Sequence, residues 1–128
     1  MTLSTMTRRI AVVIAVAGLA TVLNLALAGP SSAEEGIAKF YSDKLQGKKL
    51  ASGDVYDKSK LTASHKTLAF GTKVKVTNLD NGKSVVVTIN DRMKKSNSAV
   101  IDVTRTAAEE LGFVKAGKAK VKLEVEKS

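Results

Sequence analysis

A hairpin with alternating polar and apolar residues places the tightest limit on how this chain can fold. The alternation runs over residues 73–77 and again over residues 84–89. A period of two is typical of half-buried β-strands. The intervening Leu79-Asp80-Asn81-Gly82 contains an Asn-Gly pair, which readily adopts the positive φ of a hairpin turn. The predicted inward face carries Val74, Val76, Val85, Val87 and Ile89.

The rest of the chain after residue 33 also has the pattern of short strands and turns. Residues 37–41, 100–103 and 118–125 are predicted strands, and the polar segment 47–59 is a predicted loop with room for one short strand. Glu34 and Glu35 are expected to be a frayed start. Thr106 to Glu109 fits a helix capping box, and Gly112 ends that helix. One short helix among five or six strands predicts an all-β fold, a small barrel whose closure removes exposed strand edges.

Residues 1–33 have the order of features found in a secretory signal peptide. Arg8 and Arg9 precede an apolar run over 10–28, and small residues follow, with candidate cleavage sites after Ala28 and Ala33. An uncleaved membrane anchor is the alternative, because the run is nearly long enough to span a bilayer. The helix-breaking segment 29–33 favours cleavage. We therefore expect an exported protein of the periplasm or cell envelope, with no cysteine to carry a lipid anchor.

The part after the signal, residues 34–128, is predicted to be one domain with one modest core. Removing residues 1–33 takes away two of the 21 Lys and Arg residues and none of the 12 acidic ones, which leaves a net charge of +7. A basic surface gathers near acidic wall polymers or lipid head groups, although spread-out lysines equally serve solubility. No disulfide is available, and we expect a monomer.

Four side chains could carry chemistry, and each also has a purely structural interpretation. His65 is the only histidine, and with no cysteine present it cannot build a typical zinc site, so no metal or cofactor is expected. Asp91 ends a predicted strand, where it either caps a turn, pairs with Arg92 or acts chemically. Asp54 follows a glycine in a loop. Asp102 lies between apolar residues, and capping the next turn is its expected role.

Several motifs occur in the order seen in one known family. They are Gly36-Ile37-Ala38-Lys39-Phe40-Tyr41, Ala51-Ser52-Gly53-Asp54, Thr62-Ala63-Ser64-His65, Leu68-Ala69-Phe70-Gly71, Val76-Thr77-Asn78-Leu79-Asp80-Asn81-Gly82-Lys83, Asn90-Asp91-Arg92, Val100-Ile101-Asp102-Val103-Thr104 and Ala107-Ala108-Glu109-Glu110-Leu111-Gly112. Together these segments resemble the RlpA-like (rare lipoprotein A) double-psi β-barrel family over nearly all of residues 36–126.

The resemblance implies a six-stranded double-psi β-barrel with one or two short helices. For members that are enzymes it also implies endolytic transglycosylase activity on peptidoglycan, preferably on glycan strands without stem peptides. The family's site residues fall on Asp54, His65 and Asp91.

Such an enzyme breaks the bond between N-acetylmuramic acid (MurNAc) and N-acetylglucosamine (GlcNAc) through an oxocarbenium-like transition state, and the muramic 6-hydroxyl replaces water as the nucleophile. Our hypothesis is that Asp91 donates the first proton and then accepts the hydroxyl proton. That role needs a pKa raised by burial or by a neighbouring carboxylate. Asp54 or His65 would then orient the sugar or stabilise charge.

Two departures from the family pattern concern the expected site residues and the loop beside them. Asp54 stands where glutamate is usual, and Met93-Lys94 stand where Gly-Pro usually follows the Asp-Arg pair. The alternative function is therefore a non-catalytic wall-binding module of the expansin type, although the chain has only five aromatic residues and no tryptophan for sugar stacking. The basic charge raises nucleic-acid binding as a third class, which the export signal and the lack of a recognition motif argue against.

Overall fold

The structure is a computed structural model that describes residues 33–126. The predicted signal peptide lies outside the described residues except for Ala33, so its cleavage stays a prediction. Within residues 33–126 no helix has the length and apolar character needed to cross a membrane.

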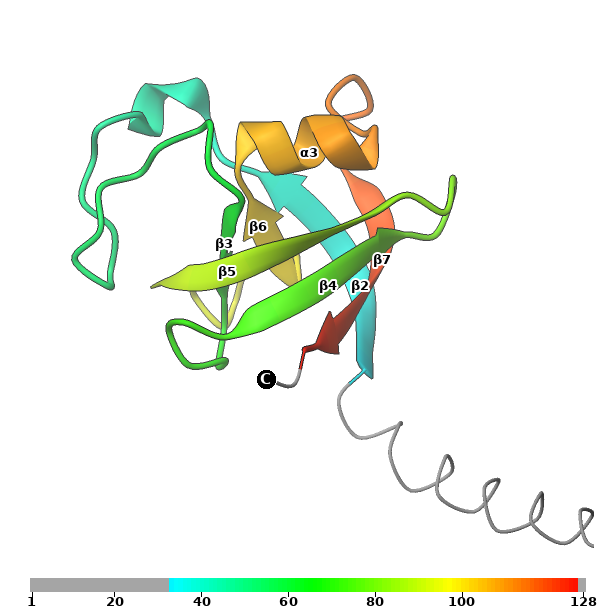
Figure 1. Cartoon of the computed structure of the whole chain (residues 1–128), viewed down its shortest axis with the longest axis horizontal. Coiled ribbons are helices and arrows are strands. Elements are labelled where there is room, and N and C mark those ends of the chain that lie inside the picture. The colour runs from blue at the N-terminus through cyan, green and yellow to red at the C-terminus, as the bar shows by residue number, and fades with distance from the viewer. Residues whose placement is uncertain (1–32, 127–128) are drawn as a thin grey trace, which may run out of the picture. The chain divides into compact units, whose positions relative to one another are not determined.

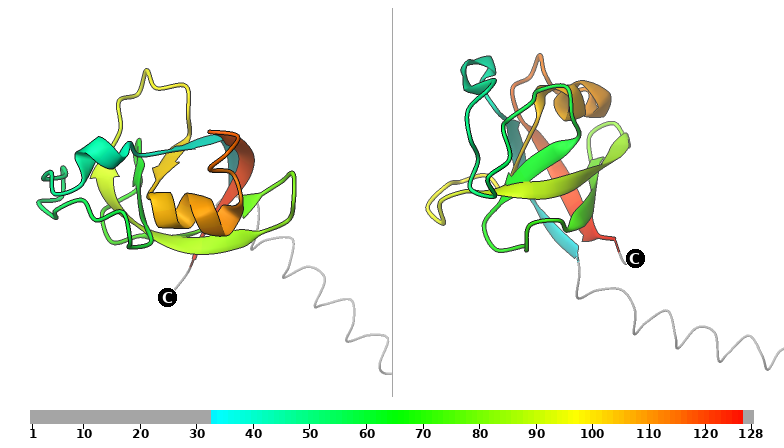
Figure 2. Two further views of the ribbon diagram at one scale, coloured as in Figure 1. Left: turned by 90° about the horizontal axis from the view of Figure 1, so that it is seen from above. Right: turned by 60° about the vertical axis from the view of Figure 1, so that its left-hand side comes forward.

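Six strands close into a barrel (Figure 1), in the order β2-β6-β3-β5-β4-β7. The pairs β2/β6 and β3/β5 are parallel, and the other four pairs are antiparallel. A short 3-10 helix, η2, follows β2, and the helix α3 lies across one end of the barrel (Figure 2). The expected six-stranded double-psi β-barrel with one or two short helices is confirmed, with two such helices in residues 33–126. The elements are β2 (Ala33–Phe40), η2 (Asp43–Leu45), β3 (Thr62–His65), β4 (Lys73–Asn78), β5 (Ser84–Arg92), β6 (Ile101–Val103), α3 (Arg105–Leu111) and β7 (Ala119–Val125).

The predicted hairpin is β4 and β5, and its inward face forms the centre of the core. Val74 pairs with Val87 and Val76 with Val85, and all four side chains are buried. Gly82 has a φ of 78° in the connecting turn, as the Asn-Gly pair predicted. The core is completed by Ile89 of β5, by the inward residues of the other strands, by the buried face of α3 and by the residue two positions after Leu111. Apart from Ile89, these residues are Ala38, Ala63, Ile101, Val103, Ala107, Ala108, Leu111, Phe113, Ala119, Val121 and Leu123.

The expectation of a frayed start at Glu34 and Glu35 was wrong. β2 begins at Ala33, and Glu34 and Glu35 pair with Leu123 and Lys122 of β7. Both glutamates are exposed, so their pairing with β7 engages their backbone groups without burying their charges. The first strand of the barrel therefore includes the last residue of the predicted signal peptide.

The predicted capping box at Thr106 was also wrong. Thr104 is the N-cap of α3: its backbone is extended, and its hydroxyl oxygen accepts a hydrogen bond from the N–H of Ala107. Glu109 pairs with Arg105 at 3.5 Å instead of capping the helix start. The predicted end at Gly112 is confirmed, with a left-handed φ of 79° that only glycine adopts easily.

Gly36 of β2 lies against the side chain of Val100, which precedes β6. A Cβ atom on Gly36 would overlap Cγ1 of Val100, whose branched side chain is stiff. We predict that Gly36→Ala lowers the free energy of unfolding by about 1–3 kcal/mol through this overlap. Urea denaturation of the variant, the Val100→Ala variant and the double variant measures it. If the double variant recovers none of the loss of the single Gly36 variant, the overlap is not the cause.

Candidate active site

A β-bulge directs the side chain of Asp91 out of the barrel. Val85, Val87 and Ile89 point inward, so regular alternation would turn Asp91 inward as well. The pairing of β3 with β5 instead shifts, from Ala63 opposite Ile89 to Ser64 opposite Asp91, and Asn90 is the extra residue. Bulges re-aim side chains in this way. Asp91 therefore lies on the outer face, beside Ser64.

Asp102 lies on the same outer face, on the other side of Ser64. Ser64 pairs with Asp102 of β6 as well as with Asp91 of β5, and paired residues share a face of the sheet. Strands lie about 4.8 Å apart, which puts the Cα atoms of the two aspartates roughly 10 Å from each other. Lys39 of β2 pairs with Asp102 and extends the row.

These side chains open into a pocket of about 500 Å³, which we call the carboxylate pocket. Its walls come from the segment after β2 and from the loop after β5. The lining residues are Phe40, Tyr41, Ser42, Leu45, Ser64, Asp91, Arg92, Met93, Lys94, Ser96, Asn97 and Asp102. The departure Met93-Lys94 thus forms part of this pocket.

Asp91 is held by two hydrogen bonds from different segments. The Tyr41 hydroxyl donates to Oδ2 at 2.5 Å, and the N–H of Ala51 donates to Oδ1 at 2.9 Å. Burial, together with the bond to Asp91, raises the pKa of Tyr41, which therefore keeps the proton that it donates. The ring of Tyr41 stacks on Tyr56 with centroids 4.6 Å apart. The carboxylate is thus fixed before any ligand arrives.

The predicted alternative of an ion pair between Asp91 and Arg92 does not occur. The Arg92 guanidinium instead donates to the carbonyl oxygen of His65 at 3.0 Å and lies over the ring of Phe70 at 4.6 Å. Arg92 still lines the carboxylate pocket, so a positive charge lies at its edge.

Asp102 was missed as a site residue by the sequence analysis. Its expected role as a turn cap was wrong, because Thr104 caps the helix that follows and Asp102 lines the carboxylate pocket. Burial raises the pKa of Asp102, the charge of Lys39 opposes this shift, and the charge of Asp91 adds to it. The alternation of Ile101, Asp102 and Val103 is the signal that would have turned Asp102 outward.

Asp54 lies in a second pocket of about 510 Å³, which we call the Asp54 pocket. Its Oδ2 accepts a hydrogen bond at 3.2 Å from Nδ2 of Asn90, the bulge residue. Tyr56 lines this pocket and Tyr41 lines the other, so their ring stack stands between the two. The lining residues are Gln46, Asp54, Val55, Tyr56, Asp57, Lys60, Thr62, Thr88 and Asn90.

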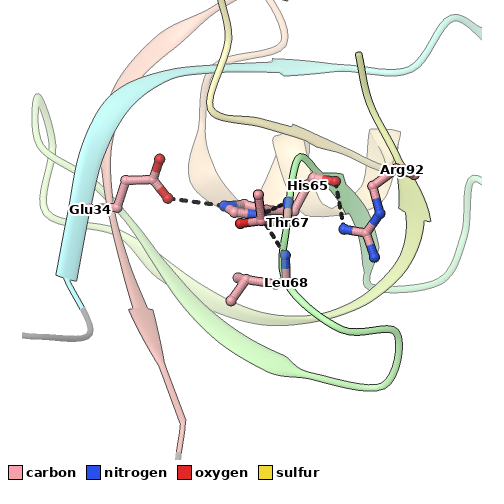
Figure 3. Close-up of polar contacts among 5 residues, drawn as sticks. All are labelled: Glu34, His65, Thr67, Leu68 and Arg92. Carbon is pink, nitrogen blue, oxygen red and sulfur yellow. Dashed lines mark hydrogen bonds and ion pairs between the residues drawn. The ribbon is translucent and has the colours of Figure 1, made fainter. Parts of the chain in front are cut away.

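The side chain of His65 lines neither pocket and points toward Glu34 (Figure 3). Its Nδ1 accepts hydrogen bonds from the N–H groups of Thr67 and Leu68, both at 3.1 Å. Nε2 therefore carries the proton and donates to Oε1 of Glu34 at 3.0 Å. The structure does not bring Asp54, His65 and Asp91 into one pocket: it separates them into two pockets and a turn.

We predict that His65→Ala destabilises the fold by about 1–3 kcal/mol, because two backbone N–H groups in a partly buried turn lose their acceptor. The loss is measured as the free energy of unfolding in urea. A variant as stable as the wild type would show that these hydrogen bonds do not hold the turn.

Asp102 gives a prediction for the pH dependence of stability. Because its pKa is raised in the fold, the folded protein binds this proton more tightly than the unfolded chain, so the group destabilises the fold as pH rises above the ordinary value of 3.8. Asp102→Asn removes that effect. The stability of the variant relative to the wild type should be greater at pH 7 than at pH 3, by less than about 1 kcal/mol because water screens this partly exposed group.

Urea denaturation at both pH values measures this difference, and comparing the variant with the wild type at each pH cancels effects of the substitution that do not depend on pH. A relative stability that falls between pH 3 and pH 7 would contradict the prediction.

Among residues 33–126, no three His, Asp or Glu side chains gather in a way that would hold a metal ion.

Comparison with solved structures defines the class of fold. The chain aligns with the Streptomyces papain inhibitor at a TM-score of 0.62 and 18% identity, covering 76% of this chain and 96% of the inhibitor. It aligns with an expansin of Clavibacter michiganensis at a TM-score of 0.60 and 21% identity, covering 75% of this chain and 51% of the expansin. At these identities the likeness shows the barrel fold alone.

Sequence comparison then shows the family. The model of the lytic transglycolase family matches residues 33–123, and the chain belongs to that family. It is 43% identical over 118 residues to the probable endolytic peptidoglycan transglycosylase RlpA of Treponema pallidum, covering 92% of this chain and 36% of the relative. It is 50% identical over 97 residues to the endolytic peptidoglycan transglycosylase RlpA of Rickettsia bellii, covering 73% and 43%. The chain thus spans less than half the length of these relatives.

Proposed function

We propose that this protein is an endolytic lytic transglycosylase that cleaves MurNAc–GlcNAc bonds in peptidoglycan glycan strands. The observation that carries the proposal is the carboxylate pocket, where Asp91 and Asp102 flank Ser64 on neighbouring strands. The family and the two RlpA relatives support the reaction class. The substrate implies a location outside the cytoplasm, in agreement with the predicted export signal.

The reaction needs one proton delivered and one removed. A carboxylic acid protonates the glycosidic oxygen as the bond between C1 of MurNAc and O4 of GlcNAc breaks. The 6-hydroxyl of the same MurNAc then bonds to C1, and a carboxylate takes the hydroxyl proton, which gives a 1,6-anhydro end. No water is consumed, and the enzyme has the same number of protons before and after.

The geometry offers two carboxyls for these steps, where the sequence hypothesis gave both to Asp91. Asp102 suits the acid, because burial and the neighbouring Asp91 favour its protonated form. Asp91 suits the base, because Tyr41 and Ala51 hold it in place as a hydrogen-bond acceptor. The proton then returns from Asp91 to Asp102. Ser64 pairs with both aspartates and therefore lies between them.

The edge of the pocket supports the preference for strands without stem peptides. Removing the peptide from MurNAc leaves the free carboxylate of its lactyl group. Arg92 and Lys94 both line the carboxylate pocket and supply positive charge that attracts such a group. His65, which lines neither pocket, acts in this proposal as a positioning residue that holds the end of β3 beside Arg92.

We predict that Asp91→Asn and Asp102→Asn each lower the formation of 1,6-anhydromuramic ends by about 10²–10⁴-fold, because each removes a proton-transfer group. The assay incubates the purified full chain with glycan strands stripped of stem peptides, and mass spectrometry detects the anhydro ends. Circular dichroism checks that each variant keeps its fold.

Asp80→Asn is the matched control, because this exposed residue lies in the β4–β5 turn and lines neither pocket. It should react like the wild type. An active Asp91→Asn variant would refute the role of Asp91. If the wild type makes no anhydro ends but is retained on the strands, the protein is a wall-binding barrel of the expansin kind and not an enzyme.

A further inference from the structure

We propose that the Asp54 pocket is a sugar-binding subsite that takes a GlcNAc unit of the same strand, and that Asp54 and Asn90 bind this unit without taking part in proton transfer. The inference rests on the proposed function for its substrate. It assigns to Asp54 a role separate from that of Asp91.

The chemistry of Asn90 points to a ligand. The residue is only 9% exposed, and its Nδ2 is used by Asp54. Its Oδ1 has no hydrogen-bond partner among residues 33–126. A buried acceptor left unpaired is unfavourable and rare in native proteins. A hydroxyl or an acetamido N–H of a sugar supplies the missing donor.

The exposed carboxylate of Asp54 controls access to this amide. Asp54 is an exposed residue of the segment between η2 and β3, and its carboxylate accepts the 3.2 Å hydrogen bond from Asn90. When the side chain of Asp54 turns toward a sugar hydroxyl, it uncovers Asn90 for the same ligand. Two polar groups on different segments then converge on one sugar, which is the usual way that a small number of polar groups orients a ligand.

The charges of the pocket select an uncharged sugar. The lining of the Asp54 pocket has two carboxylates, Asp54 and Asp57, and one cation, Lys60. The residues Thr62 and Thr88 add hydroxyl groups. A lactyl carboxylate would meet net negative charge here, whereas it meets Arg92 and Lys94 in the carboxylate pocket. The arrangement therefore matches alternating sugars, with MurNAc in the carboxylate pocket and GlcNAc in the Asp54 pocket.

The position of the two pockets explains how one glycan strand reaches both. Asn90 and Asp91 are consecutive in β5, yet one lines each pocket, because the bulge separates their directions. The Tyr41–Tyr56 stack forms the wall between them. A ligand that fills both pockets must extend over this wall, so only strands of several sugars gain from the second pocket.

The test compares full-length wild type with Asp54→Asn on stem-peptide-free glycan fragments that are separated by length. On long fragments we expect the variant to raise KM on the order of tenfold, as loss of a hydrogen bond to a charged group does, with kcat changed less than about twofold. On the shortest fragments that are cleaved, the two proteins should have equal kcat/KM. Asp80→Asn carries the same charge change outside both pockets and should match the wild type at every length.

Retention on insoluble peptidoglycan separates this inference from the proposed reaction. In the Asp91→Asn background, adding Asp54→Asn or Asn90→Ala should weaken retention, whereas adding Asp80→Asn should not. If the wild type forms no anhydro ends but this loss of retention is seen, the proposed function fails and the subsite stands. A lower kcat for Asp54→Asn at every fragment length, or retention unchanged by both variants, overturns the subsite.

Discussion

The parallel pairing of β3 with β5 is the contact on which both the barrel and its site depend. β3 has only four residues, but it lies between the strands that carry the two carboxyls of the carboxylate pocket. Ala63 faces the core opposite Ile89, and the next residue, Ser64, faces outward opposite Asp91. One short strand therefore contributes to the hydrophobic core on its inner face and sets the spacing of Asp91 and Asp102 on its outer face.

His65 stabilises the end of this strand pair through hydrogen bonds from its side chain and its backbone. Its imidazole accepts the backbone N–H groups of the turn that follows β3, and it reaches Glu34 at the start of β2 (Figure 3). Its carbonyl accepts hydrogen bonds from the side chain of Arg92 and from the N–H of Met93. A residue that lines neither pocket thus ties the ends of three strands together, and the hydrogen bonds that both nitrogens of its buried ring make explain why a lone histidine belongs at this position.

Local pattern predicted the parts of the structure that local physics decides. The β4–β5 hairpin, the strands β6 and β7 and the glycine that ends α3 all follow from local pattern and turn chemistry. Register between distant strands is different, because it depends on partners that the local pattern does not name. For that reason the sequence missed the pairing of Glu34 with β7 and the position of Asp102 beside Ser64. The N-cap at Thr104 is a local feature, and it was missed because Thr106 also fits a capping pattern. The motif resemblance named Asp54, His65 and Asp91, but not the separate pockets in which the structure places two of them.

The bulge at Asn90 also makes the site sensitive to chain length. In a strand of period two, a single added residue exchanges the inner and outer faces for everything that follows. Asp91 is an outer residue only because Asn90 precedes it as an unmatched position. Removing one residue there would leave the composition of the motif almost unchanged, yet it would turn the carboxyl toward the valine-lined interior. In this barrel the spacing of residues along β5, as much as their identity, determines whether Asp91 lies in the carboxylate pocket or in the core.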